Sequence, residues 1–189
     1  MDDIVKQALA KWPNVPDCYG WLGLDSRGNW YMRDDRTQAA GAFPSLGNAS
    51  KESKGSLLQH EKLIEFIQRN YAVDAKGQWF FQNGPQRVYV ELEATPWIWR
   101  VGQSSAGLDF AVTSHDGATA IVLRCLVDEL GRVYLQTSIG FGLVHTQDVA
   151  CAADAIEAGL WVVEDVVASA LADRFGFEAS PQSLHGKAH

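Results

Sequence analysis

The 189-residue chain has few cysteines and none of the motifs that cysteines usually form. Cys18, Cys125 and Cys151 are widely spaced and odd in number. Because no CxxC pair is present, neither a zinc ribbon nor a thioredoxin-type redox motif is available. We therefore expect buried, reduced thiols in a cytoplasmic protein and no disulfide framework.

Long apolar runs are also missing. The longest, residues 118–127, is interrupted by Arg124, and residues 162–167 contain Glu164 and Asp165. Neither approaches the roughly 20 apolar residues that a membrane span needs. The N-terminus is acidic where a signal peptide would be basic. These absences predict no membrane association.

Basic charge is scarce: 16 Lys and Arg face 23 Asp and Glu, for a net charge of −7. Residues 1–95 hold 11 basic and 12 acidic side chains, whereas residues 96–189 hold 5 and 11. The excess argues against nucleic acid or an anionic membrane as a partner, since both require a basic face. A macromolecular partner of the C-terminal region should instead be basic.

Catalytic and cofactor motifs are absent as well. The sequence contains no HExxH zinc pair, no GxSxG nucleophile elbow, no P-loop and no full GxGxxG. We predict neither a metal site nor a cofactor, and the sequence leaves open whether the protein is an enzyme.

What is present is ordinary globular composition, with 47% hydrophobic and 21% charged residues. Helical spacing of apolar residues predicts helices over residues 2–12, 56–70 and 147–175, the second with Ser56 as its N-cap and Gln59 completing a capping box. Between the last two helices the apolar period changes to two, which is typical of antiparallel strands. The predicted fold class is α+β: an antiparallel, strongly twisted or barrel-like sheet with one internal helix and a long C-terminal helix.

The final helix carries a regular apolar seam with 4-3 spacing. Its members are Val149, Ala153, Ile156, Leu160, Val163, Val167 and Ala170. Such a seam favours a homodimer through the C-terminal helix. We expect a single domain over residues 1–179, with a long loop at 34–55 that is mobile or functional, and a flexible tail at 180–189.

A hairpin signature recurs, in which an Asp precedes a Gly by three residues and an aromatic residue follows. It begins at Asp25 and again at Asp74, and a looser copy begins at Asp128. The Asp can accept hydrogen bonds from backbone amides further along the turn, and Gly takes the positive φ. We interpret these copies as structural turns, because they lack the oxygen ligands of a calcium loop.

One strand carries the most interesting polar surface. Arg87, Glu91 and Glu93 share a face at period two, with Arg100 as a further counter-charge. Carboxylates about 7 Å apart on one face could act as a general acid and base. The alternative is a solvated sheet face.

His145 is the histidine most suited to binding, because it precedes the last helix directly. Free amides at the start of that helix could hold an anion next to the imidazole. Alternatively, His145 and Thr146 only cap the helix. The candidate polar site is therefore Arg87, Glu91, Glu93, Arg100 and His145.

Residues 79–93, WFFQNGPQRVYVELE, together with the GFGLVH run at 140–145, resemble an uncharacterised proteobacterial family, a domain of unknown function. The resemblance extends over most of the chain. It implies a bacterial cytoplasmic protein and transfers no catalytic residue.

Three functional hypotheses remain. The first is a non-catalytic binding or interaction module, with an unknown small-molecule ligand. The second is a small hydrolase or isomerase that uses the carboxylates of Glu91 and Glu93. The third is a domain that senses a small anion near His145 and Arg100.

Overall fold

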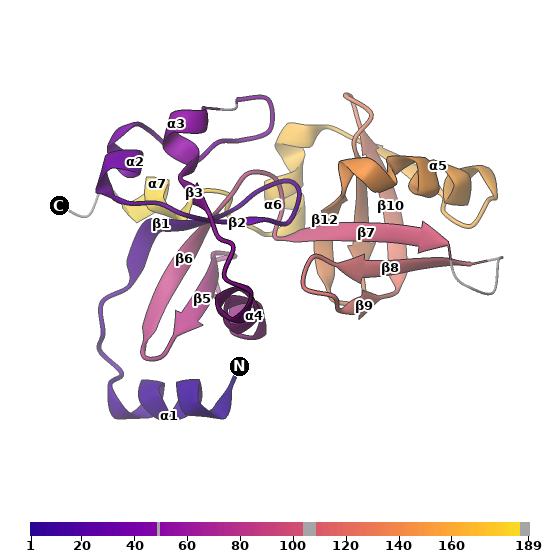
Figure 1. The fold of residues 1–189 in the computed structure, drawn as a ribbon. Coiled ribbons are helices and arrows are strands. Elements are labelled where there is room, and N and C mark those ends of the chain that lie inside the picture. Colours follow the sequence, from indigo (N-terminus) through magenta and orange to yellow (C-terminus); the bar gives the residue numbers. More distant parts are fainter. Residues whose placement is uncertain (49, 104–108, 186–189) are drawn as a thin grey trace. The chain divides into compact units, whose positions relative to one another are not determined.

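A computed structural model describes residues 1–48, 50–103 and 109–185, which form two compact units (Figure 1). Unit 1 comprises Met1–Asp25, Asn29–Glu93 and the residues from Gly176 on; unit 2 comprises Ser26–Gly28 and Ala94–Phe175. Whether the two units unfold as the single domain expected from the sequence stays a prediction.

Unit 1 is built on a six-stranded sheet with the order β3-β2-β1-β6-β5-β4. Its strands are β1 (Cys18–Leu24), β2 (Trp30–Met32), β3 (Ser56–Leu57), β4 (Tyr71–Val73), β5 (Trp79–Asn83) and β6 (Gln86–Leu92). Its helices are α1 (Asp3–Lys11), α2 (Asp35–Ala39), α3 (Lys51–Lys54), α4 (Glu61–Arg69) and α7 (Pro181–His185). Neighbouring strands are antiparallel except β1 and β6, which run parallel.

Opposite faces of this sheet are covered by different helices. Val88 of β6 and Leu63 of α4 line a common pocket, so α4 lies over the face that carries Val88. Glu91 accepts hydrogen bonds from Ser180 and Gln182, so α7 lies over the other face of β6. Both faces are therefore buried, and the solvated face considered from the sequence does not exist around Glu91, which is 1% exposed.

Unit 2 is built on a seven-stranded sheet with the order β13-β10-β11-β12-β7-β8-β9. Its strands are β7 (Trp97–Gln103), β8 (Phe110–Ser114), β9 (Thr119–Ala120), β10 (Val122–Asp128), β11 (Val133–Thr137), β12 (Gly140–Val144) and β13 (Val163–Val166). Its helical segments are η1 (Thr146–Asp148), α5 (Val149–Glu157), η2 (Ala168–Ala170) and α6 (Leu171–Phe175). Here β12 runs parallel to β7, and β13 runs parallel to β10.

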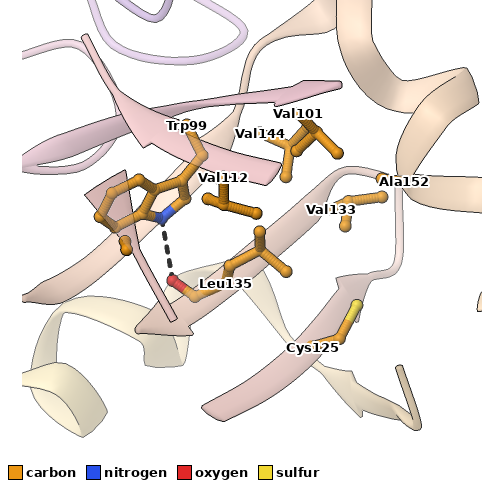
Figure 2. Packing of buried hydrophobic residues seen from close by; sticks show 9 residues of the cluster. Trp99, Val101, Val112, Cys125, Val133, Leu135, Val144 and Ala152 are labelled. Carbon is orange, nitrogen blue, oxygen red and sulfur yellow. Dashed lines mark hydrogen bonds between the residues drawn. The ribbon is translucent and has the colours of Figure 1, made fainter. Parts of the chain in front are cut away.

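An apolar core fills unit 2 (Figure 2). Trp99 and Leu135 are 0% exposed, and the indole N–H of Trp99 donates to the Leu135 carbonyl oxygen at 3.0 Å. Val112 and Val133 pack in the same cluster, and Ala152 contributes to it from α5. A buried indole normally requires such a partner, so this single bond lets the largest side chain of the core be buried without an orphaned donor.

The α+β class predicted from the sequence is confirmed, but the description of the sheet is wrong in two respects. The described strands form two sheets, and each sheet mixes parallel with antiparallel pairs. Neither sheet closes into a barrel. The parallel pairs join strands far apart in the sequence, such as β1 with β6, and alternation within one strand carries no information about such partners.

The helix predicted over residues 147–175 is also wrong. Its first part, α5, ends where Ala158 and Gly159 turn the chain, with Gly159 at φ 74° and the Leu160 N–H bonded to the Ala155 carbonyl oxygen. This is the bonding of a Schellman stop, which favours glycine. The valines that follow are β-branched and form β13. The apolar seam is therefore divided among a helix, a strand and a second helix, and the predicted homodimer loses the continuous helix on which it rested.

The internal helix begins later than expected. Ser56 and Leu57 form β3, which pairs with β2, and α4 starts at Glu61. His60 is the N-cap, and its Nδ1 accepts from the Leu63 N–H at 3.3 Å. The capping-box prediction at Ser56 is therefore wrong, because pairing with β2 determines the conformation there.

The other predictions have mixed outcomes. Residues 34–55, expected to be a loop, contain α2 and α3. Residues 181–185, expected to be part of a flexible tail, form α7, and residues 186–189 lie outside the described part of the chain. The three cysteines are free. Among the described residues no helix combines the length and apolar character needed to cross a membrane.

Candidate functional site

A cavity of about 480 Å³ lies in unit 1 beside Glu91. Its floor is the end of β6, one wall is the chain at 179–183, and its cover comes from residues 40–45, 48, 50 and 53. The lining residues whose side chains carry polar groups are Ser45, Asn48, Ser50, Ser53, Glu91, Ser180 and Ser183. The segment expected to be a loop therefore covers a cavity that contains one of the predicted site residues.

Glu91 is held firmly at the floor. Its Oε2 accepts from the Ser180 hydroxyl at 2.6 Å, and its Oε1 accepts from the Gln182 N–H at 2.9 Å. Burial raises the pKa of this carboxyl above its usual value, while the two hydrogen bonds and Arg33 oppose the rise. The result is a buried carboxylate with a fixed orientation at the edge of an open space.

Arg33 is the group that sequence reasoning missed. It is 1% exposed, and its guanidinium donates to the carbonyl oxygens of Gly20 (3.0 Å), Gly41 (2.6 Å) and Ser53 (2.9 Å). It also donates to Oε1 of Gln182 at 3.2 Å. One side chain thus connects β1, both ends of the cavity cover and α7.

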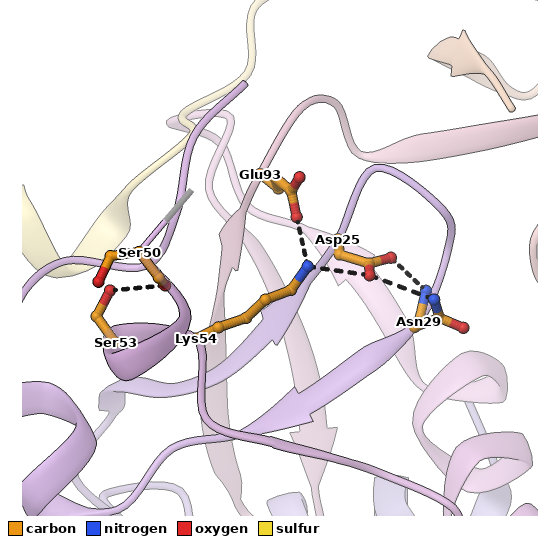
Figure 3. Close-up of polar contacts among 6 residues, drawn as sticks. All are labelled: Asp25, Asn29, Ser50, Ser53, Lys54 and Glu93. Atoms are coloured by element: carbon orange, nitrogen blue, oxygen red, sulfur yellow. Dashed lines mark hydrogen bonds and ion pairs between the residues drawn. The ribbon is translucent and has the colours of Figure 1, made fainter. Parts of the chain in front are cut away.

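The C-terminal end of the cover is fixed by Lys54 (Figure 3). Its ammonium lies 2.9 Å from Oε2 of Glu93 and 3.2 Å from Oδ2 of Asp25. It also lies 4.6 Å from the centroid of the Tyr31 ring. The two carboxylates raise the pKa of Lys54 in spite of its partial burial, so this amine is a cation and not a nucleophile.

Close packing of the cover depends on a glycine in β1. A Cβ on Gly23 would lie 2.4 Å from the ring of Phe43, which is 8% exposed and lines the cavity. Only a residue without a side chain allows that ring to lie flat on the strand. Glycine at position 23 therefore allows the cover to pack closely against β1.

The structure separates the five predicted site residues. Glu91 lies in β6, whereas Glu93 lies just beyond its end at Leu92; the two bind different partners, and Glu93 does not line the cavity. Arg87 lies near the start of β6, with its guanidinium 4.6 Å from the Phe80 ring centroid. Arg100 and His145 belong to unit 2.

In unit 2, the position considered for an anion is taken by the chain's own Asp148. Arg100 Nε lies 2.5 Å from Asp148 Oδ2, Nη2 lies 3.2 Å from Oδ1, and the Val101 N–H also donates to this carboxylate. Arg100 holds the pKa of Asp148 below its usual value. His145 Nδ1 accepts from the Gln147 N–H at 3.1 Å, which is the capping role considered for it.

A second cavity of unit 1, about 330 Å³, contains no charged side chain. It is lined by Cys18, Trp21, Leu22, Met32, Leu63, Ile67, Phe81, Asn83 and Val88. Within the described residues, His, Cys, Asp and Glu side chains form no group of three that could hold a metal ion. The Glu91 cavity is therefore the stronger candidate, because it combines a concave space with a buried charge and several hydroxyls.

Two mixed sheets and, in unit 1, a polar cavity beside Glu91 define an α+β protein. The chain belongs to a family described as "Protein of unknown function (DUF2946)", whose DUF2944 profile matches residues 1–182. The uncharacterised-family resemblance is therefore confirmed.

Two solved structures are similar to this chain. One is a DUF1285 family protein from Silicibacter pomeroyi DSS-3, with 12% identity and a TM-score of 0.46, covering 82% of this chain and 84% of its own. The other is a DUF1285 family protein from Shewanella baltica OS155, with 14% identity and a TM-score of 0.45, covering 73% and 91%. None of the curated proteins compared with this chain matches it.

Proposed function

We propose that the protein is a non-catalytic binding module that holds a small molecule in the Glu91 cavity. The observation that carries this proposal is a cavity of about 480 Å³ that is lined by the buried Glu91 and several serine hydroxyls and bordered by a cover anchored by Arg33 and Lys54. Binding sites for small molecules are typically concave, about 300–1,000 Å³ in volume, with a few convergent polar groups.

The chemistry of the site favours binding over turnover. A general acid and base must both reach the same substrate, yet Glu93 is paired with Lys54 outside the cavity lining. The serines that line the cavity have no histidine among the other lining residues to activate them. A hydrolase or isomerase that uses Glu91 and Glu93 together therefore has less support than a binding module.

The anion-sensing hypothesis has less support as well. Asp148 already neutralises Arg100 with two hydrogen bonds, and a free anion would have to displace it. The three free cysteines support the proposal that the protein acts in a reducing compartment such as the cytoplasm.

The binding proposal is tested by a thermal-shift screen of a metabolite library on three versions of the protein. A ligand that binds only the folded state raises the melting temperature. The first variant, Gly23→Ala, forces the Phe43 ring away from β1, because its Cβ would lie 2.4 Å from that ring. The matched control is Gly102→Ala in β7, where a Cβ meets no atom of the described residues within 4 Å.

We expect library hits to stabilise the wild-type protein and Gly102→Ala equally, and Gly23→Ala much less. The comparison uses the shift that each ligand causes, so a lower starting stability of Gly23→Ala does not affect it. A library without hits, or hits that stabilise all three proteins alike, would contradict binding in this cavity.

A further inference from the structure

We propose that the ligand of the Glu91 cavity is a neutral, hydroxyl-rich molecule of the sugar or polyol class. This inference rests on the proposed function and adds the chemistry of the ligand. It follows from the charge of the site, the direction of its hydrogen bonds and the apolar part of its lining.

The charge of the site is already balanced. Glu91 is the one lining residue with a charged side chain, and Arg33 lies close enough for each group to influence the pKa of the other. The four hydrogen bonds of the Arg33 guanidinium go to uncharged oxygens, so its positive charge remains to offset that of Glu91. A cationic or anionic ligand would bring a partly desolvated, uncompensated charge to a site whose own charges already offset each other, which is costly.

The hydrogen-bonding groups of the site are mainly acceptors. Each carboxylate oxygen of Glu91 takes one hydrogen bond from the chain, and a carboxylate has about four acceptor positions. The hydroxyl of Ser183, which is exposed, donates to the carbonyl oxygen of Ser180 at 2.7 Å, and this leaves its own lone pairs available as acceptors. A ligand must therefore bring several donors.

Hydroxyl groups supply donors without charge, and each of them can also accept a hydrogen bond. This second property matters because Asn48 carries an amide that can donate, and it borders the same cavity. Amines at neutral pH supply donors only together with a positive charge. A polyol thus matches both the charge and the direction of the hydrogen bonds.

The remaining lining suits the carbon skeleton of such a ligand. Phe43, Pro44 and Leu92 border the cavity together with small alanine side chains. The C–H face of a sugar ring can pack on these groups while its hydroxyls face Glu91 and the serines.

The experiment measures binding of three matched probes by isothermal titration calorimetry at pH 7. D-Glucose is neutral, D-glucosamine adds an ammonium group and D-glucuronate adds a carboxylate, while myo-inositol and D-xylose extend the neutral set. We expect at least one neutral probe to bind, and both charged analogues to bind at least tenfold more weakly than glucose or not at all.

Two variants locate the contact. Glu91→Gln replaces a charged acceptor and should weaken binding of the neutral probe by at least tenfold. Ser180→Ala removes the hydroxyl that donates to Glu91 just before α7 but retains the carboxylate and its bond from the Gln182 N–H, so it should weaken binding by less than threefold. If both variants lose the same affinity for the probe, the effect of Glu91→Gln comes from a displaced α7. Direct contact between Glu91 and the ligand would then be wrong.

Failure of this inference can be distinguished from failure of the proposed function. If glucosamine or glucuronate binds more tightly than glucose, or if no neutral probe binds while other library compounds do, the ligand class is wrong and the binding module stands. If no compound of any class binds, both are wrong.

Discussion

Units 1 and 2 arrange their first six strands in the same way. In unit 1 the spatial order is β3-β2-β1-β6-β5-β4, and in unit 2 the corresponding strands follow the order β9-β8-β7-β12-β11-β10, with β13 added beyond β10. In each unit the first and sixth strands pair in parallel. The two units therefore share one strand arrangement, but the side chains buried on it differ strongly between them.

The largest difference lies between the second and third strands. In unit 2, residues 115–118 are enough to join β8 to β9, whereas in unit 1 the connection from β2 to β3 extends from 33 to 55 and includes α2 and α3. This longer connection supplies Arg33, the cover of the cavity and Lys54. The candidate site is therefore an addition to a strand pattern that forms without it in unit 2.

The buried charges beside the cavity are handled differently from those of unit 2. In unit 2, Asp128 and Asp148 each pair directly with an arginine, Arg132 and Arg100. In unit 1, Arg33 and Glu91 each bind uncharged groups of the chain, and no direct ion pair joins them. Two buried charges that are not in contact are costly, and such a cost is commonly retained at functional sites.

The largest loss of stability should come from removing Arg33, the buried cation of unit 1. Arg33→Met leaves three carbonyl oxygens and Glu91 without their buried cation, so we expect a loss of about 3–5 kcal/mol in the free energy of unfolding. Urea denaturation measures this loss, and Arg36→Met on the exposed side of α2 is the control. A loss below about 1 kcal/mol would show that water replaces the guanidinium without difficulty.

A smaller loss is expected from the apolar core of unit 2. Leu135→Ala removes a fully buried side chain beside Trp99 and should cost about 3 kcal/mol, whereas Leu130→Ala, at a residue that is 72% exposed, should cost little. Hydrogen exchange would show where protection is lost. If Leu135→Ala weakens protection only within residues 94–175, the units unfold separately; a uniform loss supports the one-domain prediction.

The smallest of the three effects depends on pH. Asp148→Asn should cost about 2 kcal/mol at pH 7, because it removes a charged acceptor shared by Arg100 and the Val101 N–H. The folded-state pKa of Asp148 is lowered, so its contribution is present above the unfolded value near 3.8 and is lost as pH falls through the lower folded value. In urea denaturation, the difference in the free energy of unfolding between wild type and Asp148→Asn should be smaller at pH 3 than at pH 7.

Asp154→Asn, on the exposed side of α5, provides the matched control for that series. It should follow the wild-type curve at both pH values. An unchanged gap between wild type and Asp148→Asn at pH 3 would mean that the side chain stabilises unit 2 through packing and not through its charge.

Local chemistry was predicted well from the sequence. The three Asp hairpins form as expected: Asp25 accepts from the Asn29 N–H, Asp74 from the Gln78 N–H, and Asp128 from the Arg132 N–H. Each of these contacts spans four residues, and its donor, acceptor and glycine are all present in the short motif.

Longer-range features were not predictable in the same way. The apolar spacing in 147–175 fits a helix, but it does not show that β10 offers an edge to which the valines of β13 can pair. Glu91 was identified by its strand position, yet its burial depends on Ser180, 89 residues further along the chain, and on α7, which follows Ser180 directly. In the sequence, Arg33 looks like the polar end of a short strand. Its acceptors are backbone carbonyl oxygens, which every residue has, so no residue type in the sequence reveals them.

The return of the chain to unit 1 after Phe175 has a consequence for biosynthesis. On the ribosome, β6 emerges long before Ser180 and Gln182, so Glu91 lacks two of its hydrogen-bond donors while all of unit 2 is being translated. Unit 2, apart from the residues at 26–28, comes from one continuous stretch and can condense in that interval. A nascent chain arrested before residue 176 would therefore carry a finished β7–β13 sheet and an unfinished Glu91 cavity.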